Sequence, residues 1–139
     1  MRNFFYAALV VGVTFFAAAS VTLAQGSSAT IEDTIESQIE AFKADDFATA
    51  FTFASPTIQR LFGSADRFGM MVQRGYPMVW RPAEVQFLER DNVGPVSRQK
   101  VLIRDRAGQT HVLEYYMIEG PDGWLIDGVT KLPTPDVAV

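Results

Sequence analysis

Two carboxylates in the C-terminal half of the chain are the residues best placed by type to do chemistry. Glu114 lies directly beside Tyr115, and Asp127 falls in a later segment whose apolar residues alternate as in a strand. Proton transfer needs a carboxylate inside a pocket, next to a hydrogen-bond donor for the developing oxyanion. Glu114 and Asp127 are therefore the candidate catalytic bases, for a reaction of the isomerase or dehydratase type.

Binding without turnover is the main alternative to catalysis. Aromatic and methionine side chains with few charges around them suit a small apolar or amphipathic molecule. The sequence predicts that such a pocket is lined by Tyr76, Trp80, Tyr115, Met117 and Trp124. A partner protein could bind there instead, or side chains could fill the space and leave a purely structural module. Whether the chain is an enzyme stays open.

The chain has one histidine, His111, and no cysteine. A His-rich metal centre, a thiol nucleophile, an iron–sulfur cluster and a Cys-type zinc site are therefore excluded. We expect no metal and no other cofactor. His111 lies at the start of an expected strand, where an exposed position or one structural hydrogen bond is expected.

The charge of the chain argues against nucleic acid as a partner. The formal net charge is -4 and the pI is about 4.9, whereas phosphate binding needs clustered Lys and Arg. Arg98, Lys100, Arg104 and Arg106 do cluster, which we interpret as the solvated face of a strand, with an anion-binding patch as the alternative. Arg104 could also pair with Glu114 across a hairpin.

The N-terminus resembles a secretory signal peptide. Arg2 precedes an apolar run over residues 4–19, and Thr22 and Ala24 occupy small-residue cleavage positions. Cleavage near Ala24 would release a mature chain that begins at Gln25. The expected location is thus periplasmic or secreted.

An uncleaved membrane anchor is the rival interpretation of the same segment. Residues 4–24 are mostly apolar and just long enough to span a bilayer. We expect contact with the membrane only in that case. No cysteine follows the apolar run, which excludes a lipid-anchored start.

Cap and stop residues predict helices in the first half of the mature chain. The expected caps are Thr30, with Asp33 at the capping-box position, Asp45-Asp46, Ser55 and Ser64. Ser55 begins a short helix over residues 56–62, and Ser64 begins another over residues 65–74; Gly63 and Gly75 end them. Tyr76-Pro77 is expected to force the chain into an extended conformation.

After Arg81-Pro82 the apolar period changes from 3.6 to 2, which is typical of strands. The expected strands cover residues 84–91, 97–105, 110–119 and 124–131. Short turn segments separate them, among them Pro121-Asp122-Gly123, so the strands should form an antiparallel meander.

The third expected strand is apolar on both faces. One face carries Leu113, Tyr115 and Met117, and the other carries Val112, Tyr116 and Ile118. One face should cover the helices, and the other needs a second partner. We therefore expect a homodimer that packs sheet to sheet.

The length of 139 residues and 48% hydrophobic content suit one domain. The expected division is a signal peptide (1–24), a linker (25–30), one α+β domain (31–132) and a flexible tail (133–139).

Helices followed by a curved antiparallel four-stranded meander resemble the nuclear transport factor two-like superfamily, an α+β cone that is also called cystatin-like. More specifically, QIEAFKADDFATAFTFASPTIQRLFG, FGMMVQRGYPMVWRPAEVQFLE, and Gln99 with VLIRD, EYYM and DGWLIDGV resemble domain-of-unknown-function family 4864, from about Glu36 to Val129. The resemblance implies helices closed over a concave sheet, with a pocket between them. As in related ketosteroid isomerases, that pocket can hold a binding site or an acid–base pair. The family itself carries no activity to transfer.

Overall fold

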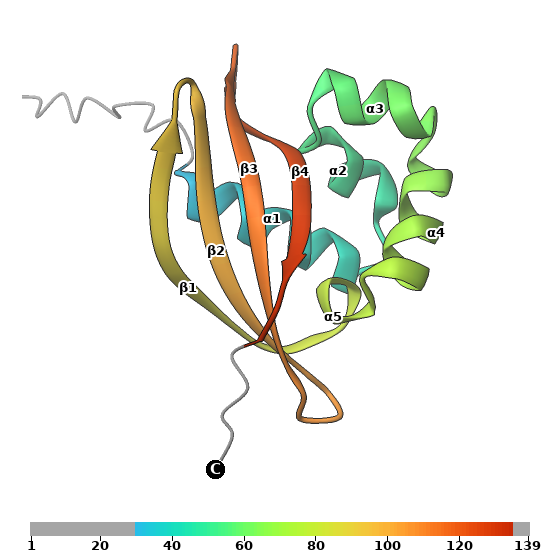
Figure 1. Ribbon diagram of the computed structural model, residues 1–139. Coiled ribbons are helices and arrows are strands. Elements are labelled where there is room, and N and C mark those ends of the chain that lie inside the picture. The colour runs from blue at the N-terminus through green and yellow to red at the C-terminus, as the bar shows by residue number, and fades with distance from the viewer. Residues whose placement is uncertain (1–29, 135–139) are drawn as a thin grey trace, which may run out of the picture.

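The structure is a computed structural model that describes residues 30–134. Within this range five helices precede four strands (Figure 1). The helices are α1 (Ile31–Lys43), α2 (Phe47–Thr52), α3 (Pro56–Phe62), α4 (Ala65–Gly75) and α5 (Pro77–Trp80). The strands are β1 (Pro82–Val93), β2 (Val96–Asp105), β3 (Thr110–Gly120) and β4 (Gly123–Leu132).

The expected signal peptide, all but the last residue of the linker, and residues 135–139 lie outside the described range. None of the helices between residues 30 and 134 has both the length and the apolar character needed to cross a membrane.

The predicted caps begin the helices. Thr30 and Asp33 form a reciprocal capping box at α1, and the side chains of Asp46, Ser55 and Ser64 accept hydrogen bonds from the first turns of α2, α3 and α4. These side chains satisfy backbone N–H groups that have no partner inside the helix.

The prediction of extended chain at Tyr76-Pro77 was wrong. Tyr76 has a non-helical backbone, as a residue before proline should, but Pro77 opens the short helix α5. The fixed φ of proline suits a first helical position, where its missing N–H costs nothing. The non-helical backbone of Tyr76 thus ends α4, and α5 starts at the next residue, Pro77.

The strands form one antiparallel sheet in the order β1-β2-β3-β4, and each strand is one to four residues longer than expected. The turn into β4 needs Gly123, whose φ is 133°. The possible pairing of Arg104 with Glu114 does not form, because the register sets Lys100 opposite Glu114 and Thr110 opposite Arg104. Arg104 instead pairs with Glu84 on β1, at 3.2 Å between guanidinium and carboxylate atoms.

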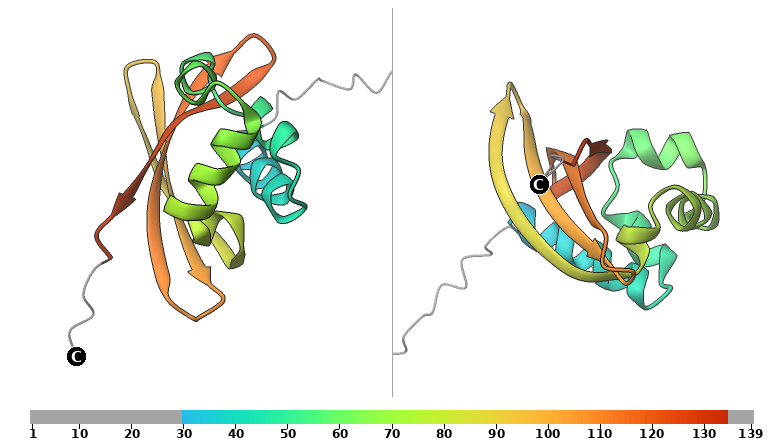
Figure 2. Two further views of the ribbon diagram at one scale, coloured as in Figure 1. Left: turned by 90° about the vertical axis from the view of Figure 1, so that its right-hand side faces the viewer. Right: turned by 60° about the horizontal axis from the view of Figure 1, so that its bottom comes forward.

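The helices lie on one face of the curved sheet, with β1 and β2 bowed away from α2, α3 and α4 (Figures 1 and 2). Leu113, Tyr115 and Met117 of β3 face the helices and are fully buried. They pack against the apolar stripe of α1, which includes Ile35, Ile39 and Phe42. The predicted α+β cone is confirmed, and its interior lies between this face of the sheet and the helices.

Candidate functional site

A pocket of about 220 Å³ lies between the helices and the last two strands. Fifteen described residues line it. Twelve of them have apolar side chains or are glycine, and the other three carry polar groups. They are Gln38, Phe42, Ala54, Ile58, Leu61, Phe62, Phe68, Met71, Val72, Tyr76, Val79, Tyr115, Ile126, Gly128 and Val129. With polar groups on Gln38, Tyr76 and Tyr115 alone among these lining residues, the wall is mostly apolar.

The helix α3 carries one side of the pocket, and its position is fixed at its N-terminal end. The Ser55 backbone N–H donates to the Ile126 carbonyl, and the Ile126 N–H donates to the Phe53 carbonyl, both at 2.8 Å. The Ser55 hydroxyl, fully buried, donates to Asp127 Oδ1 at 2.7 Å and accepts from the Ile58 N–H at 3.3 Å. These contacts attach the start of α3 to β4.

A group of phenylalanine rings forms the helical wall. Phe68 on α4 lies within 5.3–5.7 Å, centroid to centroid, of Phe42, Phe51 and Phe62, and all three pairs are tilted. Tilted aromatic pairs are favourable beyond the area they bury. The wall is thus a packed layer that the sheet faces across the pocket.

Tyr115 of β3 carries the most unusual polar group among the residues that line the pocket. Its side chain is fully buried, and its hydroxyl has no hydrogen-bond partner among residues 30–134. Burial strongly raises the pKa of this phenol, and the nearby Tyr76 raises it slightly further. Tyr115 therefore stays neutral and keeps its proton as a hydrogen-bond donor.

The two other polar side chains of the wall are already engaged. The Tyr76 hydroxyl donates to the Val129 carbonyl at 3.0 Å, and Lys131 lies 4.8 Å from the centre of the Tyr76 ring. The Gln38 amide donates to the Ala50 carbonyl at 3.2 Å. Of the three polar side chains that line the pocket, Tyr115 has the one hydroxyl without a hydrogen-bond partner among residues 30–134.

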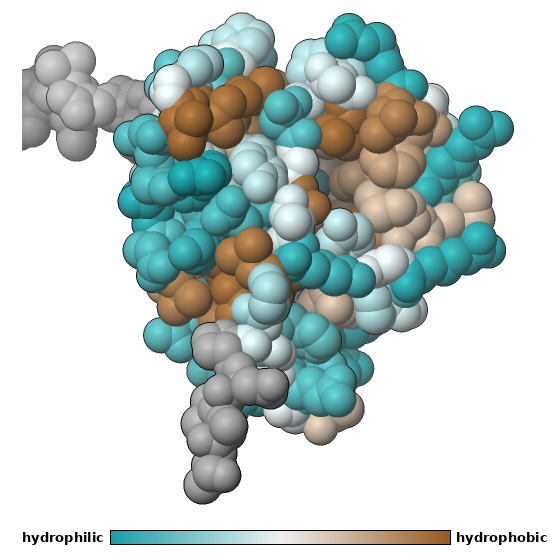
Figure 3. Space-filling model, in the orientation of Figure 1, coloured by the Kyte–Doolittle hydropathy of each residue, from teal (hydrophilic) through white to brown (hydrophobic). Residues whose placement is uncertain are grey.

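The mouth of the pocket lies toward solvent along α3 and α4. Figure 3 shows apolar side chains gathered over these helices on the side toward β4. Leu61 of α3 lines the pocket and is 71% exposed, an unusual position for a leucine. Ile58, Leu61 and Phe62 follow the helical i, i+3, i+4 spacing, which was the available sequence signal for this side of the pocket. These three residues and Met71 of α4 were not among the predicted ligand-binding residues.

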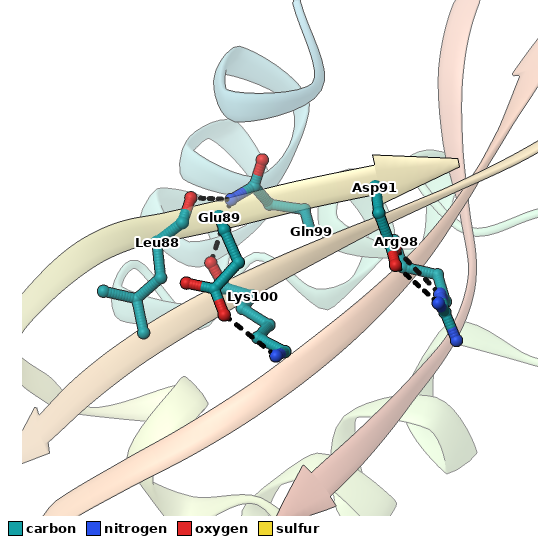
Figure 4. A network of polar contacts seen from close by, with 6 residues as sticks. All are labelled: Leu88, Glu89, Asp91, Arg98, Gln99 and Lys100. Carbon is teal, nitrogen blue, oxygen red and sulfur yellow. Dashed lines mark hydrogen bonds and ion pairs between the residues drawn. The ribbon is translucent and has the colours of Figure 1, made fainter. Parts of the chain in front are cut away.

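The candidate base Glu114 lies on the other face of the sheet. Strand alternation points it away from Tyr115, and it is 9% exposed opposite Lys100. Two ion pairs between β1 and β2, Glu89 with Lys100 and Asp91 with Arg98, lie on this face (Figure 4). The hydrogen bonds that Arg98 donates to Asp91 raise the pKa of Arg98, and the charge of Glu114 adds a smaller effect in the same direction. Glu114 thus belongs to a charged ladder outside the pocket.

The candidate base Asp127 does not line the pocket either. It is the extra residue of an irregularity in β4, where Tyr116 lies opposite Gly128 and Met117 lies opposite Ile126. This position turns its carboxylate toward Ser55, from which it accepts its hydrogen bond. None of the described residues that line the pocket is Asp, Glu, His, Lys or Arg.

The five predicted ligand-binding residues are distributed over several places. Tyr76 and Tyr115 line the pocket together. Met117 is fully buried in the core, and Trp80 donates from Nε1 to Asp45 at 2.9 Å while the Arg81 guanidinium stacks on its ring.

Trp124 lies by a separate groove near the start of α1. Ile31 and Arg90 also line this groove. Trp124 therefore does not join Tyr76 and Tyr115 at the pocket. His111 contacts Asp105 at 2.8 Å, the single structural hydrogen bond that its strand position predicted.

The fold has counterparts among solved structures. A SEC-C motif-containing protein from Rhodopseudomonas palustris is 18% identical, with a TM-score of 0.58, and the match covers 77% of this chain and 82% of that chain. A putative NTF2-like transpeptidase from Campylobacter jejuni is 10% identical, with a TM-score of 0.51, and the match covers 71% and 99% of the two chains. Identities this low show the fold alone. The fold class is therefore the NTF2-like α+β cone.

The family is shown by the sequence itself. Residues 24–139 match the family described as Domain of unknown function (DUF4864), and the chain belongs to that family. No curated protein matches the chain.

Proposed function

We propose that this protein binds a small apolar molecule, without catalysis, in the pocket between the helices and β3 and β4. The observation that carries the proposal is an apolar space of about 220 Å³ that reaches the fully buried Tyr115. An engineered apolar cavity of about 150 Å³ is enough to bind benzene. The pocket thus suits one ring or a short chain.

The proposal of catalysis by Glu114 or Asp127 has weaker support. A base must come within about 3 Å of the proton that it removes. Glu114 is held among charges on the far face of the sheet, and Asp127 is held by Ser55. The described pocket wall offers neither of them to a bound molecule.

A titration with toluene tests the binding proposal, followed by ¹H–¹³C NMR of the methyl groups. We expect saturable shifts at Ile58, Leu61 and Val129 in the wild-type protein. The variant Val129→Phe narrows the pocket and should weaken binding about tenfold, equivalent to ~1.4 kcal/mol. Circular dichroism checks that this variant is folded.

The matched control is Thr130→Phe, one position further along β4. Thr130 is exposed and lies on the opposite face, across from Glu114, so the added ring should leave toluene binding unchanged. Non-saturable shifts in the wild-type protein, or equal affinities of the Val129 and Thr130 variants, would contradict a binding pocket at this place.

We also propose that the protein acts after export as a homodimer. The family match begins at residue 24, where the expected signal peptide ends. On the outer face of the sheet Leu102, Val112 and Leu132 lie side by side across β2, β3 and β4, and all three are half-buried in the single chain. A second copy would cover this apolar row.

Mass spectrometry tests both parts of this second proposal. The intact mass of protein purified from its native host should correspond to a chain that starts near Gln25, and native spectra should show a dimer. Val112→Lys should give a monomer, whereas Leu61→Lys, on the helical side, should not. A full-length mass or a wild-type monomer would overturn the respective part.

A further inference from the structure

The pocket wall runs from a buried tyrosine on the sheet to an exposed leucine on α3. Tyr115 is fully buried on β3, whereas Leu61 on α3 lines the same pocket and is 71% exposed. A molecule that reaches past the aliphatic side chains as far as the Tyr115 hydroxyl would have a polar group at one end of its site and apolar ones at the other. This change in polarity along the pocket would favour one orientation of the ligand, in addition to the limit that the pocket volume sets on its size.

The hydroxyl of Tyr115 is a donor without an acceptor. Buried hydroxyls in native proteins nearly always have a hydrogen-bond partner, and leaving one without a partner is costly. Within residues 30–134 the Tyr115 hydroxyl has none, and the Tyr76 hydroxyl already donates to the Val129 carbonyl. A ligand oxygen that accepts from Tyr115 would remove this cost.

The charge of the wall restricts what that oxygen can be. The described lining holds no cationic side chain, so a buried carboxylate or phosphate would have only one phenol to replace its water. Burial also keeps the phenol protonated, which makes it a donor to a neutral acceptor. An uncharged carbonyl fits both conditions.

We propose that the ligand is an uncharged carbonyl compound with its oxygen at one end of an apolar body, bound with the oxygen on the Tyr115 hydroxyl and the apolar part toward Leu61. This inference rests on the proposed binding function and adds the chemical class and the orientation of the ligand. Neither proton transfer nor covalent chemistry is involved.

Three probes of nearly equal size test the class. They are 2-heptanone, whose carbonyl is the second carbon from one end, 2-methyl-1-heptene, which has CH₂ in place of the oxygen, and hexanoate, which carries a charge at the same end. Dissociation constants are measured by NMR titration for the wild-type protein and for Tyr115→Phe, which keeps the ring and removes only the hydroxyl.

The readout is the ratio of the variant's Kd to the wild-type Kd, because this ratio cancels the different affinities of the probes for water. For 2-heptanone we expect the ratio to be about five or more, the equivalent of one hydrogen bond, and for the alkene one or less. Hexanoate should bind more weakly than 2-heptanone in the wild-type protein.

The isomer 4-heptanone tests the orientation. It has the same atoms as 2-heptanone, but its carbonyl lies in the middle of the chain. Wild-type protein should bind 2-heptanone more tightly than 4-heptanone, and Tyr115→Phe should lose this preference.

The outcomes separate this inference from the binding function. If the alkene and toluene bind but Tyr115→Phe leaves the ketone affinity unchanged, the pocket stands and the carbonyl assignment is wrong. Tighter binding of hexanoate than of 2-heptanone would overturn the neutral class, and equal affinities for the two ketones would overturn the orientation. If none of the probes binds, the proposed function itself fails.

Discussion

The substitution Ser55→Ala should destabilise the protein more than the loss of an ordinary helix cap does. The Ser55 hydroxyl accepts from the Ile58 N–H as the cap of α3, and it donates to Asp127 Oδ1 at 2.7 Å from a fully buried position. Losing a serine cap costs about 1 kcal/mol, and losing a hydrogen bond to a charged group costs about 1.5–3 kcal/mol. Together they predict a loss of about 3 kcal/mol in the free energy of unfolding.

The matched control is Ser64→Ala, because Ser64 caps the neighbouring helix α4. Its hydroxyl accepts from the Arg67 N–H at 3.2 Å in an exposed setting, so this variant should lose only about 1 kcal/mol. Urea unfolding followed by circular dichroism measures both values. In thermal melts the difference of about 2 kcal/mol corresponds to roughly 10 °C between the two variants.

Equal destabilisation of the two serine variants, within about 0.5 kcal/mol, would refute the special role of the Ser55–Asp127 contact. A double-mutant cycle with Asp127→Ala adds a direct measure, since the two side chains should couple by more than about 1 kcal/mol. Ser55→Ala should also weaken toluene binding relative to Ser64→Ala, because Ser55 holds the helix that carries Leu61.

Two further predictions concern stability alone. Gly69→Ala should destabilise by about 1–3 kcal/mol, because the added Cβ would lie 2.6 Å from the Phe47 ring, whereas Gly75→Ala has open space and should be neutral or stabilising in the same denaturation assay. The hydrogen bond from His111 holds the pKa of Asp105 below its usual range. The stability that Asp105 contributes is therefore fully present above its unfolded-state pKa of about 3.9, and it is lost as the pH falls through the lower pKa of the folded state. Asp105→Asn should make the free energy of unfolding fall less steeply with pH in this acidic range. An unchanged pH dependence would contradict the prediction.

Local signals in the sequence predicted most of the fold. Thr30, Ser55 and Ser64 each begin a helix because a side-chain oxygen can satisfy a free N–H within three residues, a geometry that needs no tertiary information. The strands followed equally from the period-2 alternation and the turn residues between them. The helix at Pro77 was missed because Tyr76-Pro77 has two readings, an extended dipeptide or a helix start, and the packing of the chain decides between them.

The candidate site was harder to predict from the sequence than the fold, because it depends on which face of its strand or helix each side chain lies on. Alternation within β3 separates Glu114 from Tyr115, and this could have been read from the sequence. The irregularity at Asp127 could not, since it depends on two residues of β4 meeting one of β3. The place of Leu61 at the mouth of the pocket could not be predicted from the sequence either. An apolar residue on a short helix does not indicate which other element it faces.

The hydroxyl of Tyr115 is the point at which the demands of the fold and of binding differ. A phenylalanine at position 115 would fill the same space in the core and would leave no polar atom unpaired. Tyr115→Phe should therefore raise the free energy of unfolding of the ligand-free protein by about 1 kcal/mol or more, although most core substitutions lower it. A site where the chain departs from the residue that packs best is where a function is expected. If Tyr115→Phe lowers stability in urea, the hydroxyl already has a partner in the folded protein, and the carbonyl proposal loses its physical basis.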